Sequence, residues 1–353
     1  MSDQRMASYH AERDKLYIEK IREILRQLPS FCGVYFRSLE TTTTPLTRYA
    51  YAIDLRGFFE YLIQELPQFE DRPLPSLTPE DINALEAYHL EQYLSDMSLY
   101  IKDERERTNT EQAKARKLSA LRSFFKHCYK NGLLSNNIAA LLETPKLREK
   151  AIIRLEPNEV ANLLDLAEKG DGLTERQKKY HEATKVRDVA ILTMFLGTGI
   201  RISELVGLNI MDIDLENDAF LVTRKGGKED VLNFGNEVSM ALSQYLAERL
   251  SIEAVEGHEH ALFLSLQKRR ITPRAVENLV KKYARIAAPL KKISPHKLRS
   301  TYGTMLYHET QDIYLVADVL GHKDVNTTRR HYAAASEENK RIAAKKIHLR
   351  QDS

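Results

Sequence analysis

The chain has 353 residues, and because a single hydrophobic core rarely grows beyond about 250–300 residues, this length predicts two domains. Lys and Arg number 53 against 50 Asp and Glu, a net charge of +3, which excludes a globally basic protein, so any nucleic-acid surface must be a local patch. The two cysteines, Cys32 and Cys128, lie far apart without metal-ligand spacing, which excludes a disulfide framework. No apolar signal core or run of about 18 apolar residues is present, so we expect a soluble, cytoplasmic protein without a membrane span.

Three helices are predicted in the first hundred residues. Residues 12–28 carry apolar side chains at helical spacing, namely Ile18, Ile21, Leu25 and Leu28. Residues 41–63 begin with a threonine cluster and Pro45, which are typical of a helix start. One apolar face then follows, formed by Tyr51, Leu55, Phe58, Phe59 and Leu62. The sequence "TPED" opens the third helix, near 79–98.

The fourth helix is predicted over residues 110–132. Its apolar face contains Leu118, Leu121, Phe125 and Cys128. Six Lys or Arg residues stand against one Glu between residues 111 and 130, which is consistent with a solvated helix face and equally with contact to phosphates. The candidates for DNA contact are Lys114, Lys117, Arg122, Lys126 and Lys130.

A change of composition at 144–154, with Pro145 and Pro157, predicts a linker between domains 1–145 and 151–353. After it we expect a helix at 157–169, a polar loop at 170–183, an apolar helix at 186–199 and a β-hairpin at 218–234 around two glycines. Further helices are expected at 236–250, 273–287, 295–309, 311–320 and 325–332. The predicted fold class is therefore mainly α, with an all-helical first domain and a second domain of helices with a small antiparallel sheet.

Four stretches of the second half carry groups suited to phosphate. They are "GTGIRISEL" with Arg201, "TRKGGKED" with Lys225, "SPHKLRS" with His296 and Arg299, and "GHKDVNTTRRHYA" with His322 and Tyr332. Taken singly, each is ordinary, because an arginine after a loop or a lysine at a hairpin tip is usually a solvated surface residue and most tyrosines pack.

One reaction needs the whole set, namely attack of a tyrosine hydroxyl on a DNA phosphodiester. Two arginines can neutralise the extra charge on the nonbridging oxygens without a metal. Tyrosine has a free pKa near ~10, so it needs cations or a base nearby to become a nucleophile. The 5′-hydroxyl is a poor leaving group without a proton, and a lysine on a mobile hairpin could supply that proton.

The same motifs carry a resemblance to a known family. The stretches "TGIRISELVGL", "TRKGGKED", "SPHKLRSTYGTML" and "VLGHKDVNTTRRHY" occur in the order found in the tyrosine recombinase/integrase family. The segment "SALRSFFKHCYKNGLLSNNIA" is similar to the core-binding, SAM-like domain of that family. Within the family the chain is most similar to Xer-type recombinases of the single-protein, XerS-like kind. The resemblance implies a core-binding domain in residues 1–145 and a catalytic domain in 151–353.

The resemblance also implies roles for the phosphate-binding residues. Arg201 and Arg299 would clamp the scissile phosphate. His322 would donate a hydrogen bond to the same phosphate. Glu204 matches a supporting acidic position that orients the arginines and the histidine.

Proton transfer and nucleophilic attack would fall to other residues. The resemblance makes Lys225 the general acid toward the 5′-oxygen, with Lys228 the second choice, and lets His296 assist proton transfer at the tyrosine. Tyr332 would form the 3′-phosphotyrosine, with Tyr314 a distant alternative.

The chain departs from the family pattern in two places. Ser300 stands directly after the second arginine, where the family often has histidine. The interval from His322 to Tyr332 is ten residues, and His331 occupies the position nine residues on that the nucleophile usually takes.

The resemblance further implies no cofactor and no metal, double-stranded DNA with a specific recombination site, and a homotetramer that acts on two DNA sites through a Holliday junction. A tail helix near 336–350 would pack on its own domain or on a neighbouring protomer. With no long segment ahead of the core-binding helices, a Xer-like resolvase assisted by a divisome DNA translocase is favoured, in a cytoplasmic, nucleoid-associated setting. The alternatives are a mobile-element integrase, a type IB topoisomerase and a non-catalytic DNA-binding protein.

Overall fold

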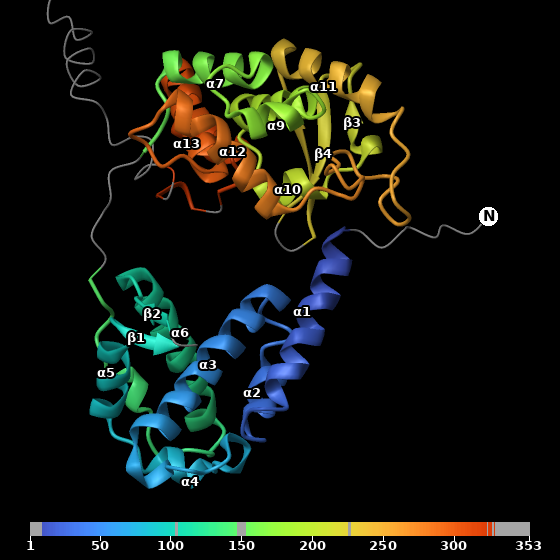
Figure 1. Ribbon diagram of the computed structural model, residues 1–353. Helices are drawn as coiled ribbons and strands as arrows, with labels where there is room; N and C mark the ends of the chain where they lie inside the picture. The colour runs from blue at the N-terminus through green and yellow to red at the C-terminus, as the bar shows by residue number, and fades with distance from the viewer. Residues whose placement is uncertain are drawn as a thin grey trace, which may run out of the picture. The chain divides into compact units, whose positions relative to one another are not determined.

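The computed structural model describes residues 9–102, 105–146, 153–224, 227–322, 324–326 and 328. The chain divides into two compact units, Met1–Lys150 and Ala151–Ser353. Figure 1 shows helices as the main element of both units. Among the described residues, none of the helices has the length and apolar character that crossing a membrane requires.

The first unit is built on three long helices, α1 (Tyr9–Leu25), α3 (Pro45–Glu65) and α6 (Glu111–Lys130). Helix α3 packs against both α1 and α6. The shorter elements are α2 (Cys32–Ser38), α4 (Pro79–Asn83), α5 (Ala87–Asp96), the 3-10 turns η1 (Pro67–Phe69), η2 (Leu74–Ser76) and η3 (Ile138–Ala140), and the strands β1 (Tyr100–Lys102) and β2 (Arg105–Arg107). Because β1 and β2 pair antiparallel, this unit is helical with one short hairpin in addition.

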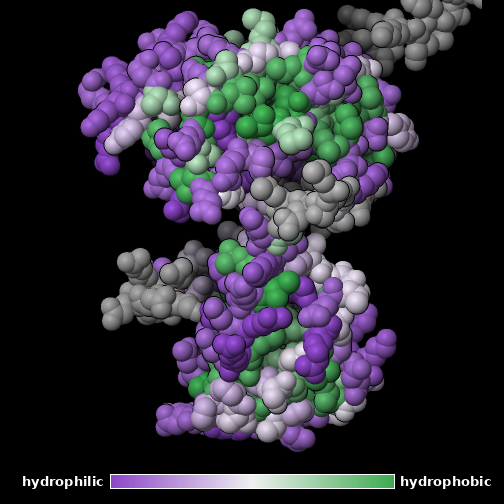
Figure 2. All heavy atoms as spheres, turned by 90° about the vertical axis from the view of Figure 1, so that its right-hand side faces the viewer, coloured by the Kyte–Doolittle hydropathy of each residue, from purple (hydrophilic) through white to green (hydrophobic). Residues whose placement is uncertain are grey.

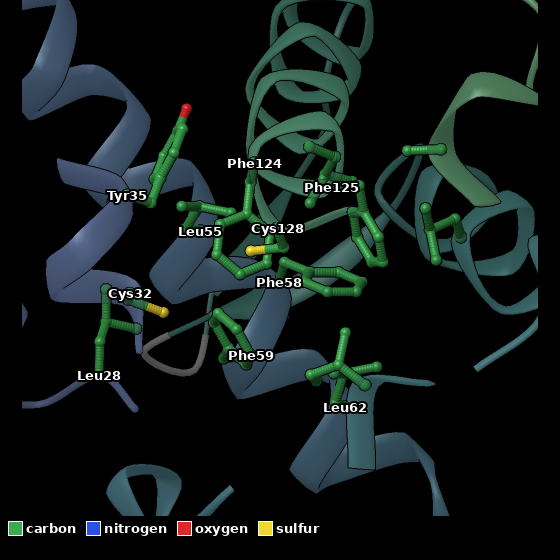
Figure 3. Close-up of a cluster of buried hydrophobic side chains, with 14 of the residues drawn as sticks. Leu28, Cys32, Tyr35, Leu55, Phe58, Phe59, Leu62, Phe124, Phe125 and Cys128 are labelled. Atoms are coloured by element: carbon green, nitrogen blue, oxygen red, sulfur yellow. The ribbon is translucent and has the colours of Figure 1, made fainter. Parts of the chain in front are cut away.

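Aromatic side chains fill the core of the first unit. Figure 3 shows Phe58 and Phe59 of α3 facing Phe124 and Phe125 of α6, all four at most 1% exposed. Centroid distances of 5.9 Å for Phe59–Phe124 and 6.3 Å for Phe58–Phe125, with interplanar angles of 84° and 69°, make these edge-to-face contacts. The apolar faces predicted from helical spacing in α3 and α6 are therefore the buried faces.

Two sequence-based predictions in the helical regions are wrong. One helix was expected over 79–98, but the chain forms α4 and α5, since Glu86 begins a new helix whose His89 Nδ1 accepts the Glu86 N–H at 3.0 Å. A polar loop was expected over 170–183, but it contains α8 (Glu175–His181), whose first turn is closed by the reciprocal contacts of Thr174 and Gln177.

The second unit surrounds one buried helix, α9 (Lys185–Thr198), which packs against α7 (Pro157–Lys169), α11 (Asn236–Arg249) and α13 (Pro295–Thr310). Apolar residues occur on every side of α9, as expected for a helix enclosed by others. The remaining elements are α10 (Ile202–Gly207), η4 (Ile210–Asp212), α12 (Pro273–Ala287), α14 (Ile313–Val319) and the strands β3 (Ile213–Asp214), β4 (Ala219–Thr223) and β5 (Glu229–Asn233).

The strands form an antiparallel sheet in the order β3-β4-β5, and β4 pairs with β5 from Ala219 with Asn233 to Thr223 with Glu229. The predicted hairpin at 218–234 is confirmed. The expected helix at 325–332 and the tail helix at 336–350 lie largely or wholly outside the described residues.

A buried polar network fixes the start of α9. The Asp188 carboxylate, 1% exposed, accepts hydrogen bonds from Lys282 Nζ and Tyr283 Oη of α12, both at 2.9 Å. Burial, followed by the nearby Asp188 charge, raises the pKa of Tyr283. The network ties the first turn of α9 to α12.

Apolar side chains also reach the surface of the second unit. Figure 2 shows them gathered on the face that carries α11 and the β-sheet. The exposed large apolar residues of η4, the sheet and α11 with its C-cap are Met211, Val231, Met240 and Leu250. These four apolar side chains therefore lie outside the hydrophobic core of the second unit.

Candidate active site

The first candidate arginine sits at a sharp turn between two helices. Gly199 ends α9 in the left-handed region at φ 62°, and a Cβ there would lie 2.4 Å from Tyr302 and 2.8 Å from Leu320, so only glycine fits. Arg201 then forms the N-cap of α10. Its backbone N–H donates to Glu204 Oε2 at 2.9 Å, and its Nη1 donates to Glu204 Oε1 at 2.7 Å. Glu204 is 3% exposed, so the carboxylate is a buried anchor for the arginine.

Arg201 and Arg299 converge on the C-terminal end of α14. Arg299 lies on α13, is 4% exposed, and donates from Nη1 to the Gly199 carbonyl and from Nη2 to the Leu320 carbonyl. Arg201 Nη2 donates to the same Leu320 carbonyl at 3.0 Å and to the Gly321 carbonyl at 2.8 Å. The last carbonyls of a helix lack partners within it and carry partial negative charge, which is why they hold two guanidinium groups together.

His322 is fixed by the turn that closes α14. Gly321 has φ 59°, and the backbone N–H groups of Gly321 and His322 return to the Asp318 and Ala317 carbonyls at 2.8 and 2.9 Å. His322 Nδ1 lies 2.8 Å from Oγ1 of the fully buried Thr328. This hydrogen bond holds the orientation of the ring.

His296 belongs to the same helix as Arg299, one turn earlier, as the spacing of three residues predicted. The His296 residue is exposed. Its backbone carbonyl accepts the hydroxyl of Ser300 at 3.0 Å. Ser300, which stands where the family often has histidine, thus makes a contact within its own helix.

Lys225 and Tyr332 lie outside the described residues. The alternative lysine, Lys228, is exposed on the far side of the hairpin turn, and its carbonyl accepts the Arg224 N–H at 2.7 Å. The alternative tyrosine, Tyr314, is 71% exposed in the first turn of α14, about 9 Å along the helix axis from Leu320.

Arg224 was missed by the sequence analysis, although the structure places it in the site. Its side chain is 9% exposed, its Nε donates to Asp230 Oδ2 at 3.1 Å, its Nη2 donates to the Val319 carbonyl at 3.2 Å, and its Nη1 lies 3.6 Å from Glu204 Oε1. Alternation along the strand could have identified it, because Phe220 and Val222 are buried and position 224 falls on the same face.

The basic candidates on α6 have different surroundings. Lys114 forms an ion pair with Glu111 at 3.2 Å, and Lys117 lies 3.5 Å from the buried Asp54. Arg122 donates to the Leu142 carbonyl and to Thr144 Oγ1. Lys126 and Lys130 are exposed on the last turns of α6. Only these last two of the five are turned to solvent without such an internal contact in the described part of the chain.

The arrangement in the second unit can bind an anion. Two clustered arginines present fork-shaped donors of fixed charge, and a histidine held by a buried threonine stands two residues after the shared Leu320 carbonyl. In the described residues, no group of three or more His, Cys, Asp or Glu is placed to hold a metal ion.

Comparisons with known proteins identify the family of the chain. The phage integrase family matches residues 153–339. The tyrosine recombinase XerC of Caldanaerobacter subterraneus subsp. tengcongensis is 35% identical over 302 residues, which cover 84% of this chain and 79% of the relative. The tyrosine recombinase XerS of Streptococcus agalactiae is 30% identical over 354 residues, which cover 92% and 98%.

The fold also has counterparts among solved structures. The XerH site-specific recombinase bound to its palindromic difH substrate has a TM-score of 0.59 and 20% identity, and the match covers 85% of this chain and 80% of XerH. Helices with a small antiparallel sheet, the fold class predicted from the sequence, are therefore shared with a recombinase of known structure.

Proposed function

The chain belongs to the phage integrase family and is a Xer-like tyrosine recombinase, an enzyme that transfers DNA strands, and from this premise we propose how it acts. It recognises a specific site in double-stranded DNA, cleaves through a 3′-phosphotyrosine on Tyr332, and rejoins the strands through a Holliday junction. A homotetramer on two DNA sites carries out the exchange. No cofactor is needed, because the phosphotyrosine keeps the energy of the broken phosphodiester.

The phosphate is held by Arg201 and Arg299. The observation that supports this role is their common acceptor, the Leu320 carbonyl, which fixes both guanidinium groups within hydrogen-bond distance of one atom. Donors fixed in advance stabilise developing charge without reorganising during the reaction. His322 adds a donor, and Glu204 keeps Arg201 in place.

Bond exchange at phosphorus is balanced by two proton transfers. The Tyr332 oxygen forms a bond to phosphorus as the bond to the 5′-oxygen breaks. His296 accepts the tyrosine proton, and the Lys225 ammonium gives its proton to the departing 5′-oxygen. The reverse sequence on a partner strand restores the phosphodiester and the free tyrosine.

The two units have different roles in the proposed reaction. Residues 1–145 bind DNA as the core-binding domain, with Lys126 and Lys130 in contact with phosphates, and residues 151–353 are the catalytic domain. Exposed lysines at a helix end can neutralise phosphates directly, whereas the internal pairs of Lys114 and Lys117 hold those side chains to the fold.

The biological role that we propose is resolution of chromosome or plasmid dimers, in the cytoplasm on nucleoid DNA, with a divisome DNA translocase as partner. It is supported by the match to XerS, which extends over 98% of that relative. Integration or excision of a mobile element is the second candidate, since it uses the same two-domain plan and chemistry.

The decisive experiment is to map the covalent adduct. Purified protein is incubated with fragmented genomic DNA, adducts are captured under denaturing conditions, and both halves are identified. Peptide mass spectrometry should place the nucleotide on Tyr332, and sequencing of the attached DNA should return one recurring site. A site near the replication terminus supports dimer resolution, whereas a site at the end of a mobile element supports integration. Absence of any adduct would contradict the proposed function.

A further inference from the structure

Arg224 connects three elements of the candidate active site. It follows the last residue of β4, and its guanidinium reaches Asp230 on β5, Glu204 on α10 and the Val319 carbonyl at the end of α14. The Glu204 oxygen that it faces at 3.6 Å is the one that accepts Arg201 Nη1 at 2.7 Å. Two guanidinium groups thus share one buried carboxylate oxygen.

Gly321 packs directly against the Arg224 guanidinium. A Cβ at residue 321 would lie 2.9 Å from both Cζ and Nη1 of Arg224, and the backbone there has φ 59°. The turn that carries His322 therefore packs closely against Arg224, and its positive φ favours glycine at residue 321.

The backbone of Arg224 also closes the hairpin turn. Its N–H donates to the Lys228 carbonyl at 2.7 Å, and its own carbonyl accepts the Gly227 N–H at 3.1 Å. Lys225 follows directly in the sequence. A residue whose side chain is anchored at the arginine cluster thus holds the base of the turn that bears the lysine.

We infer that Arg224 is a positioning residue that fixes the base of the hairpin turn, which Lys225 follows directly in the sequence, relative to Arg201 and Arg299. The inference rests on the proposed function, in which Lys225 protonates the leaving 5′-oxygen. The Arg224 side chain is 9% exposed at the base of the hairpin turn and acts through the residue that follows it. Its fork of donors spans acceptors on β5, α10 and α14, which a single-point ammonium cannot do.

The competing explanation is that Arg224 only stabilises the fold, as another buried arginine does. Arg249 is 3% exposed and donates to the carbonyls of Ala261, Ile252 and Glu259, none of which belongs to the hairpin, α10 or α14. Arg249→Met is therefore the matched control for loss of a buried arginine.

The two explanations differ in how cleavage depends on the leaving group. In a duplex with sulfur in place of the bridging 5′-oxygen, the P–S bond breaks to give a thiolate, which needs no proton because a thiol has a pKa of roughly 8.5 against ~15.7 for water. A defect in proton delivery therefore disappears on the sulfur substrate, whereas a defect in phosphate binding or folding does not.

Single-turnover cleavage is measured on the oxygen and sulfur duplexes of the mapped site, with wild type, Arg224→Met, Lys225→Ala and Arg249→Met. Arg224→Met should cleave the oxygen duplex on the order of 10 to 100 times more slowly, a part of the ~10²–10⁴ that a positioned acid contributes, and recover the wild-type rate on sulfur. Lys225→Ala should show the same selectivity, more strongly. Arg249→Met should show none.

Equal loss on both duplexes by Arg224→Met would overturn the inference. Where that variant does not fold, as judged by thermal unfolding, Asp230→Asn replaces it. This change removes one partner whose side chain is 42% exposed and should give a smaller defect with the same selectivity for oxygen. Equal loss on both duplexes by Asp230→Asn would also overturn the inference.

The lysine and the proposed function are tested separately by the same series. If Lys225→Ala is slowed equally on both duplexes, Lys225 is not the general acid and the inference for Arg224 fails with it. If the wild type forms no adduct on either duplex, the proposed function itself is wrong.

Discussion

Arg201 and Arg299 donate hydrogen bonds to the same atom, the carbonyl oxygen of Leu320, although one caps α10 and the other lies on α13. The two differ in their surroundings, since the Arg201 side chain is 34% exposed and Arg299 is 4% exposed. Replacement of either arginine should therefore slow cleavage to a similar extent, whereas the effect on the melting temperature should differ between the two.

Substitution by lysine separates these effects. Arg201→Lys and Arg299→Lys should each slow cleavage by about 10²–10³-fold, since each removes a preorganised donor from the transition state. Only Arg299→Lys should also lower the melting temperature clearly, because one ammonium cannot satisfy the Gly199 and Leu320 carbonyls in a buried site. Single-turnover cleavage and thermal unfolding measure the two effects. Equal melting temperatures of the two variants would contradict the difference in anchoring.

Removal of the Tyr332 hydroxyl should separate binding from cleavage. Tyr332→Phe is expected to bind the target duplex as wild type does and to form no covalent adduct, because the nucleophilic oxygen is absent. Gel-shift binding and denaturing electrophoresis provide the two measurements, with Tyr314→Phe as the control that keeps full adduct formation. An adduct from Tyr332→Phe protein would show that another residue attacks the phosphate.

Gly321→Ala tests the packing of the turn after α14 against Arg224. Alanine in the left-handed region costs about 1 kcal/mol, and here the Cβ also meets the guanidinium at 2.9 Å. We expect a loss of both stability and cleavage. The control is Gly132→Ala, because Gly132 has φ 69° and a Cβ added there would meet no atom within 4 Å. This variant should therefore show the cost of the backbone strain without a steric contact. Unchanged cleavage by Gly321→Ala would argue against this contact in catalysis.

The two exposed lysines of α6 should account for part of the salt dependence of DNA binding. Lys126→Ala and Lys130→Ala should each weaken binding regardless of sequence and reduce the slope of log K against log salt by about 1. Lys114→Ala, which removes a residue paired with Glu111, should leave the slope unchanged. Fluorescence anisotropy across a salt series measures the slopes, and identical slopes for all four proteins would exclude these phosphate contacts.

One carboxylate of the first unit gives a defined pH dependence. Both oxygens of Asp81 accept hydrogen bonds from Arg72 at 2.8 Å, which lowers the pKa of Asp81 to about 2. Because the unfolded value is near ~3.9, the ion pair stabilises the fold fully above that pH, and its contribution disappears as the pH falls toward 2. Allowing for solvent screening, we expect about 1 kcal/mol at neutral pH.

The measurement is the melting temperature of wild type and Asp81→Asn at pH 7 and pH 3. The difference should be clear at pH 7 and roughly halved at pH 3, because Asp81 is still mostly ionised in the folded protein at that pH. Asp165→Asn is the control, because Asp165 is 62% exposed and its pair with Lys169 lies at 3.4 Å, so it should change little at either pH. A difference that grows on acidification would contradict the assigned sign.

The sequence predicts the long helices and the hairpin well because their apolar periodicity is strong. Helix α7 has the predicted bounds, and α11, α12 and α13 differ from theirs by at most one residue. Helix α8 was missed because "ERQKKYH" has no apolar face and depends on its capping contacts. The break between α4 and α5 likewise depends on the local contact of Glu86 with His89.

In the candidate site, residue identity predicted the arginines and the histidines, and the structure brings Arg201, Arg299 and His322 to one helix end. Periodicity could not show which acceptors hold the arginines, since these are backbone carbonyls. Arg224 was missed because a charged residue beside a glycine turn is normally solvated, whereas here strand alternation and Glu204 keep it inside.

The acceptor shared by the two arginines belongs to the main chain, and this has a consequence for how the site tolerates change. Substitution of the Leu320 side chain alters packing but leaves the carbonyl in place. The geometry of the cluster therefore depends on the helix ending at that residue, and insertions, deletions or a non-glycine residue at position 321 should harm it more than replacement of Leu320 by another apolar side chain. The geometry of the site thus depends on the path of the backbone as much as on its side chains.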